Sequence, residues 1–218
     1  CALPISLQNY YAFEWGDALF VVLDPFWPTQ QRSGGQGASG WAITLGDVQY
    51  RWLEATLAAS TARLKFVFIH HLVGGAGGEH RGGVEFAGLY EWGGRGANGR
   101  NEFAAQRPGW SMPIHALLVK YGVNVVFHGH DHLFAHQELD GVTYQEVPQP
   151  SHPEQRVQTL ARAYGYEHGD ILPSPGHVRV TVTGGEARVE YVRSFLAAEA
   201  RQGRPNGRVD FSYAVGER

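Results

Sequence analysis

The sequence predicts a layered α/β fold. Short, almost wholly apolar runs of strand length lie at residues 18–23, 65–69 and 123–127, and such runs are typical of strands buried on both faces. Helical patterns separate the runs, and histidines gather where the second and third runs end. Open α/β sheets place their functional sites at these strand ends.

The first predicted element is a β-hairpin between Tyr10 and Asp24. Two β-rich stretches meet at Gly16-Asp17, and the second stretch is apolar throughout. Pro25 and Pro28 end the second strand, because proline cannot donate to a strand ladder.

A Gly/Ser-rich loop at 31–41 precedes a helix that we expect to begin at Asp47, with Asp47 as its N-cap. Apolar side chains recur at helical spacing, so this helix should pack on the sheet. The strand at 65–69 then delivers two adjacent histidines at its end. The apolar helix positions are Val48, Trp52, Leu53 and Leu57.

A long segment at 72–112 is rich in glycine and has little periodicity. Loops of this length in a compact domain are functional or disordered, and the Trp and Tyr residues in it argue against plain disorder. We consider Glu102, Arg107 and Trp110 as substrate-binding residues, with Arg107 holding a phosphate group. The alternative is a loop anchored by its aromatic residues.

A helix at 114–122, preceded by Pro113 and ending at a glycine, leads into the third strand. Asp140-Gly141 and Gly184-Gly185 predict two β-hairpins in the remaining chain. The residues after 196 are polar, so we expect a loosely held tail at 196–218.

The third strand runs into the sequence HGHDH, residues 128–132, with His130 and His132 flanking Asp131. Imidazoles at strand ends are suited to hold a divalent metal, and Gly129 would let the chain bend sharply so that the rings converge. For His128 we favour a buried histidine bonded to backbone, and for Asp131 a role in supporting the turn. The remaining histidines are expected at structural or surface positions; they are His80, His115, His136, His152, His168 and His177.

Gly-His-Asp-His after an apolar strand, preceded by a strand that ends in His70, resembles the last two sequence blocks of the calcineurin-like metallophosphoesterase superfamily. This superfamily includes purple acid phosphatases. Bacterial members are similar to this chain from Tyr10 to about Pro150. The resemblance implies a two-sheet sandwich flanked by helices, of which this chain supplies the C-terminal part and its β-hairpins.

The resemblance also implies two divalent or trivalent metal ions, Mn, Zn or Fe, in the complete protein. His130 and His70 would bind the second ion and His132 the first, with His71 as a competitor of His70. The Asp-x-His, Gly-Asp-x-x-Asp and Gly-Asn-His blocks of the family are absent from the sequence. We therefore expect residues 9–195 to be a partial domain whose missing N-terminal half is its natural partner, with an uncovered apolar face that favours self-association.

The expected function is hydrolysis of phosphomonoesters or phosphodiesters by the complete protein, with little activity in this chain alone. The alternative is a non-catalytic module with a mononuclear, structural histidine site. Residues 1–8 are interpreted as a non-native leader. Many relatives of this type are exported, which favours an extracytoplasmic or secreted setting.

The charge balance indicates neither nucleic acid nor a membrane as a partner. Lys and Arg number 18 against 21 Asp and Glu, giving a formal net charge of -3, and no basic run stands out. A phosphate ester is instead the expected ligand. The single cysteine excludes an internal disulfide and a thiolate metal cluster.

Overall fold

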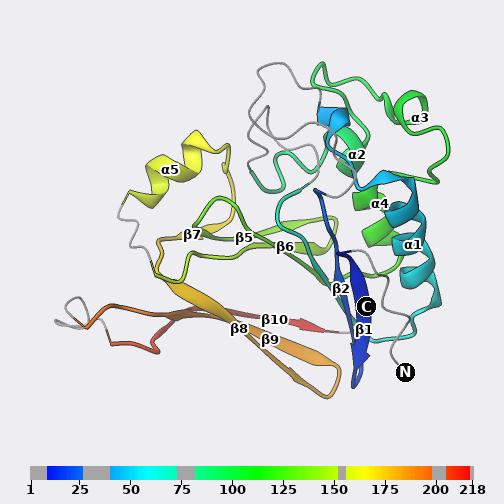
Figure 1. Cartoon of the computed structure of the whole chain (residues 1–218). Coiled ribbons are helices and arrows are strands. Elements are labelled where there is room, and N and C mark those ends of the chain that lie inside the picture. Colours follow the sequence, from blue (N-terminus) through cyan, green and yellow to red (C-terminus); the bar gives the residue numbers. More distant parts are fainter. Residues whose placement is uncertain (1–8, 27–39, 73–81, 152–155, 198–204, 217–218) are drawn as a thin grey trace.

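The structure is a computed structural model that describes residues 9–26, 40–72, 82–151, 156–197 and 205–216. A seven-stranded mixed sheet forms the middle layer. Helices cover one of its faces, and a three-stranded antiparallel sheet covers part of the other (Figure 1). The predicted α/β sandwich is confirmed.

The large sheet has the strand order β1-β2-β3-β4-β6-β5-β7. Its four central strands, β2, β3, β4 and β6, are mutually parallel, so their carboxyl ends lie along one edge of the sheet. The strands are β1 (Tyr11–Trp15), β2 (Ala18–Val22), β3 (Leu64–Phe68), β4 (Val125–His128), β5 (Phe134–Leu139), β6 (Val142–Glu146) and β7 (Asp170–Leu172).

The predicted hairpins of this sheet are present. β1 and β2 pair as antiparallel strands around Gly16, whose φ is 59°. β5 and β6 pair around Asp140-Gly141, where both residues have positive φ, 48° and 80°. Asn/Asp-Gly pairs favour this geometry because glycine adopts positive φ without steric cost.

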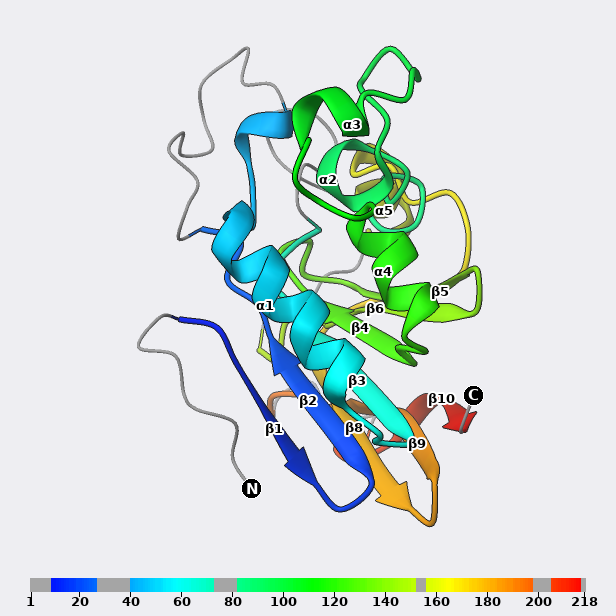
Figure 2. The ribbon, with the colours of Figure 1, turned by 90° about the vertical axis from the view of Figure 1, so that its right-hand side faces the viewer.

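The helical layer packs on one face of the large sheet. Figure 2 shows α1 and α4 lying along β2, β3 and β4. Leu53 and Leu57 of α1 and Leu117 of α4 belong to the same buried cluster as Val67 of β3 and Val126 of β4. The helices are α1 (Gly46–Ala59), α2 (Tyr90–Gly93), α3 (Phe103–Gln106), α4 (Ile114–Lys120) and α5 (Val157–Ala163), with a 3-10 turn η1 (Gly40–Ala42).

Two details predicted for α1 are wrong. Val48 is 68% exposed and does not face the sheet. Asp47 is not the N-cap, because its carboxylate accepts a 2.6 Å hydrogen bond from the indole of Trp110. The first backbone amides bond elsewhere: Gly46 donates to Thr44 Oγ1 and Leu45 donates to Glu91, far along the chain.

The second sheet has the order β10-β9-β8, and its predicted β8–β9 hairpin is present. The expectation of a loosely held tail is wrong for residues 209–216, which pair with β9 as β10. Alternation explains the strand, because Tyr213 and Val215 pack on the apolar cluster between the two sheets. The strands are β8 (Gly176–Thr183), β9 (Glu186–Arg193) and β10 (Val209–Gly216).

Some predictions fall outside the described residues: the leader at 1–8, most of the loop at 31–41, residues 73–81 of the long segment, and the side chains of His80 and His152. Within the described ranges, no helix has both the length and the apolar character needed to cross a bilayer.

Candidate metal site

The ends of β3 and β4 bring His70 and His130 together. Nε2 of His70 lies 3.2 Å from Nδ1 of His130, although the residues are 60 positions apart. Backbone bonds fix this approach: the amide of Gly129 donates to the carbonyl of His70 at 2.9 Å, and Ile69 donates to Phe127 at 3.0 Å. The sheet therefore sets the position of both imidazoles.

The sharp bend after β4 is made by the histidines themselves. His130 and His132 have φ values of 93° and 61°, whereas Gly129 does not adopt positive φ. The predicted role of Gly129 as the bending residue is wrong. Positive φ is unfavourable for residues other than glycine and is frequent at functional sites.

Hydrogen bonds from other elements hold this strained turn. The backbone amide of Asp131 donates to Oε1 of Glu146 at 2.9 Å. The hydroxyl of Ser174 donates to the carbonyl of His132 at 2.7 Å.

Asp131 is buried and bonds within the protein. Its Oδ2 accepts hydrogen bonds from the hydroxyl of Tyr166 at 2.8 Å and from the amide of Gly82 at 3.1 Å. These contacts agree with a role in supporting the turn, as expected for Asp131.

His128 is buried, but its partner is not the expected backbone group. Its Nδ1 lies 2.7 Å from Oε2 of Glu146, the residue opposite it on β6. Burial lowers the pKa of His128 to about 4. Burial, together with the charge of Asp131, raises the pKa of Glu146 well above its ordinary value. Both directions favour a neutral imidazole, with the proton on Glu146.

His70 is exposed at the edge of the sheet. Partial burial of the ring lowers the pKa of His70, and His130 and His132 lower it further while Asp131 acts in the opposite direction. A neutral imidazole has the lone pair that a metal ion needs.

His71, the competitor of His70, is only 4% exposed, and its ring centroid lies 5.8 Å from that of His130. The geometry thus favours His70 as the partner of His130.

The histidines fit part of a metal site. His132 is exposed beside them, and its charge acts on His70. However, no group of three or more His, Cys, Asp or Glu side chains suited to a metal ion is present among the residues that the structure describes. The described donor set is therefore a pair of close imidazoles with His132 near them.

Asp24 follows β2 at the same sheet edge as the histidines, and it was not predicted from the sequence as a candidate site residue. It is buried, and its backbone forms a pair of 2.8 Å hydrogen bonds with the side chain of Gln49. Its Oδ1 accepts from the amide of Phe26, whose ring centroid lies 5.4 Å from that of His70 and 5.2 Å from that of His71. The signal was available, because Asp24 follows an apolar strand just as His70 does.

A hollow of about 320 Å³ opens beside His70 at this edge. Apart from two histidines and a glycine, its walls are apolar. The lining residues are Val22, Leu23, Phe68, Ile69, His70, Phe127, His128, Gly129 and Val147.

The three proposed substrate-binding residues of the long segment have partners within the protein. Arg107 pairs with Glu91 and donates to the carbonyl of Trp41. Glu102 accepts a 3.0 Å hydrogen bond from the indole of Trp41. Trp110 stacks on Tyr50 with ring centroids 3.8 Å apart. These contacts support the alternative interpretation, a loop anchored by its aromatic residues.

Solved structures of larger proteins contain a similar fold. GAP50, the anchor in the inner membrane complex of Plasmodium, matches with a TM-score of 0.55 at 10% identity, covering 98% of this chain and 56% of GAP50. PhoD matches with a TM-score of 0.57 at 18% identity, covering 97% of this chain and 42% of PhoD. Purple acid phosphatase PPD1 from yellow lupin seeds reaches a TM-score of 0.48 at 14% identity, covering 95% of this chain and 32% of PPD1. The last likeness is too weak to carry an argument.

No protein-family profile and no curated protein sequence matches the chain. At identities of 10% and 18%, the likeness to GAP50 and PhoD establishes the fold alone. The chain spans about half the length of GAP50 and less than half that of PhoD. The chain thus has the fold of part of these larger proteins.

Proposed function

We propose that this chain is part of a metal-dependent phosphoesterase whose metal ions are held by His70, His130 and His132. The observation that carries the proposal is the 3.2 Å approach of the His70 and His130 ring nitrogens at the carboxyl ends of adjacent parallel strands. The Gly-His-Asp-His motif and the likeness of the fold to PhoD support it.

The protein contributes rigid, neutral ligands. β3 and β4 fix the two imidazoles, and the surroundings of His70 lower its pKa so that its lone pair is available. Two metal ions, when bound, would stabilise the charge that develops on phosphoryl oxygens and activate water for attack. The substrate class we propose is a phosphomonoester or phosphodiester.

Catalysis also needs carboxylate ligands and a proton donor. The sequence contains no Asp-x-His, Gly-Asp-x-x-Asp or Gly-Asn-His block. We therefore expect this chain alone to hydrolyse an aryl phosphate slowly or not at all. An extracytoplasmic setting for the complete protein belongs to the same proposal.

The test is metal binding by the purified chain. After removal of metals with a chelator, the chain is dialysed against Zn²⁺ or Mn²⁺, and the bound metal is counted by mass spectrometry. We expect about one ion per chain, with loss of binding in His70→Ala and in His130→Ala. His177→Ala is the matched control, because His177 is an exposed histidine on the other sheet.

The remaining outcomes are informative. Absence of binding, or binding that is unchanged in both variants, would contradict the metal-site proposal. About two ions per chain, with metal-dependent hydrolysis that His130→Ala abolishes, would support the phosphoesterase. The same result would contradict our expectation that the chain needs the three absent sequence blocks for activity.

The second candidate function is a non-catalytic module with a single structural metal ion. This second function is favoured because, among the residues that the structure describes, only two histidine rings come within 3.2 Å of each other and no larger group of metal-binding side chains is present. A structural ion stabilises the fold. Zn²⁺ should then raise the melting temperature strongly, while aryl phosphate hydrolysis stays absent even when the complete protein is assayed.

A further inference from the structure

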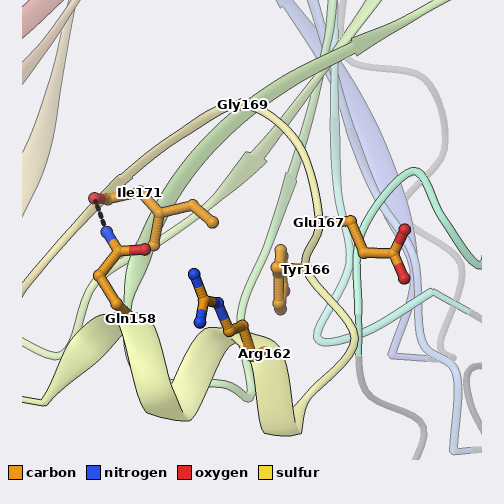
Figure 3. A pocket seen from close by; sticks show the side chains of 6 residues that line it. All are labelled: Gln158, Arg162, Tyr166, Glu167, Gly169 and Ile171. Carbon is orange, nitrogen blue, oxygen red and sulfur yellow. Dashed lines mark hydrogen bonds between the residues drawn. The ribbon is translucent and has the colours of Figure 1, made fainter.

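A second hollow shares no lining residue with the hollow beside His70. It has a volume of about 440 Å³ and opens between α5 and the segment that leads into β7 (Figure 3). This volume is typical of small-molecule sites. The lining residues are Gln158, Arg162, Tyr166, Glu167, Gly169 and Ile171.

Arg162 is the cation of this pocket. It lies on the last turn of α5, and in the described part of the chain no carboxylate forms an ion pair with its side chain. Figure 3 shows its guanidinium within the lining, whereas the carboxylate of Glu167 points away from it beyond Tyr166. A guanidinium with open N–H groups in a concave site favours a carboxylate or a phosphate.

The neighbouring groups are already held in position. Gln158 donates one amide hydrogen to the carbonyl of Ile171 at 3.3 Å, which leaves its second amide hydrogen for a ligand. The amides of Glu167 and His168 both donate to Oε1 of Glu85 at 2.9 Å. Because these hydrogen bonds already order this side of the pocket, a ligand that binds here loses little free energy in ordering it.

We propose that this pocket binds a small organic molecule through a carboxylate or phosphate group, with Arg162 as the charged partner. The carboxylate or phosphate group of the ligand pairs with the guanidinium of Arg162. The rest of the hollow accommodates the organic part of the ligand beside Ile171 and the ring of Tyr166. This site is separate from the histidines and holds whether or not they bind metal.

The pocket is also connected to the histidine turn. The hydroxyl of Tyr166 donates a 2.8 Å hydrogen bond to Asp131, which lies between His130 and His132. A ligand against Tyr166 is thus separated from the turn by one side chain.

The test is anion binding by the full chain, freed of metal with a chelator so that metal-bound phosphate cannot contribute. Inorganic phosphate and malonate are titrated separately by calorimetry or by NMR. We expect binding of at least one of them, weakened about tenfold or more in Arg162→Gln. Arg51→Gln, which alters an exposed arginine on α1, is the matched control and should leave the affinity unchanged.

A gain-of-function variant covers the case in which Arg162→Gln disturbs folding. Gln158→Lys adds a second cation to the exposed rim and should tighten binding several-fold. Preference for phosphate or for malonate identifies the ligand group. The proposal would be overturned if neither anion bound, or if the affinity were unchanged in both Arg162→Gln and Gln158→Lys. It would also be overturned if His130→Ala abolished binding while Arg162→Gln bound the anion fully.

Discussion

Arg107 forms an ion pair with Glu91, a residue 16 positions earlier whose side chain is completely buried. Burial raises the pKa of Glu91, while the charge of Arg107 and the hydrogen bonds from Thr44 and Leu45 act in the opposite direction. Because Thr44 and Leu45 immediately precede α1, this pair ties the long segment to the helical layer.

Arg107→Ala should lower the free energy of unfolding by about 3 kcal/mol, because it leaves a buried carboxylate without its charged partner. Urea denaturation measures the change. Arg179→Ala is the control, since Arg179 pairs with Glu190 at the surface and the loss of this solvent-screened pair should change stability much less. Equal effects of the two substitutions would contradict an anchoring role for Arg107.

His132 should tolerate glycine better than alanine. Its φ of 61° lies in the left-handed region, which glycine adopts without strain and alanine does not. We expect the metal-free His132→Gly chain to be more stable than His132→Ala by about 1 kcal/mol, as measured by chemical denaturation. Equal stability would show that the turn relaxes when the histidine is removed.

Glu85 should make stability depend on pH in the acidic range. Burial tends to raise its pKa, but hydrogen bonds from Gln137 and from the amides of Glu167 and His168 outweigh it and hold the pKa below the ordinary 4.5. The folded state therefore binds the proton less readily than the unfolded state. The stabilisation is present above pH 4.5 and is lost as the pH falls through the lower, folded-state value.

Glu85→Gln should flatten the decline in unfolding free energy below pH 4.5, measured by urea denaturation at several pH values. Glu138→Gln is the control, because Glu138 has a 68% exposed side chain and lies 4.0 Å from its nearest histidine nitrogen. An identical acid profile in wild type and Glu85→Gln would rule out this contribution.

β1 should promote self-association. It lies at the edge of the large sheet, and alternation puts three aromatic side chains on one of its faces: Tyr11, Phe13 and Trp15 are 41%, 37% and 79% exposed. Exposed apolar edge strands favour aggregation. Phe13→Lys combined with Trp15→Lys should weaken self-association about tenfold in sedimentation experiments.

Val48→Lys is the control for this prediction, because Val48 is an exposed apolar residue on a helix rather than on an edge strand. A monomeric wild-type chain at high concentration would contradict the prediction, as would an equal effect of Val48→Lys.

The three buried strands and the hairpins could be predicted because their signals are local. The apolar run before His70 and the Asp140-Gly141 turn determine their elements within a few residues. The capping of α1 could not be predicted, because Leu45 donates to Glu91, which lies 46 residues away. β10 was missed although apolar and polar residues alternate along it, which is itself a local strand signal.

The candidate site was predictable to the same extent. The sequence predicts that His70 and His130 follow two buried strands, and the parallel pairing of β3 with β4 brings their rings together. The bend at His130 and His132 instead of Gly129 depends on contacts from Glu146 and Ser174, which no local pattern contains.

The position of the two imidazoles depends on the pairing of β3 with β4. The connection is anchored to the helical layer through Glu91 and Arg107 and passes through an exposed turn at Asn98 and Gly99. Segments of different length could therefore be grafted at this turn without moving His70 relative to His130. The fold thus offers an exposed turn at which new sequence can be added while the pair of imidazoles stays fixed.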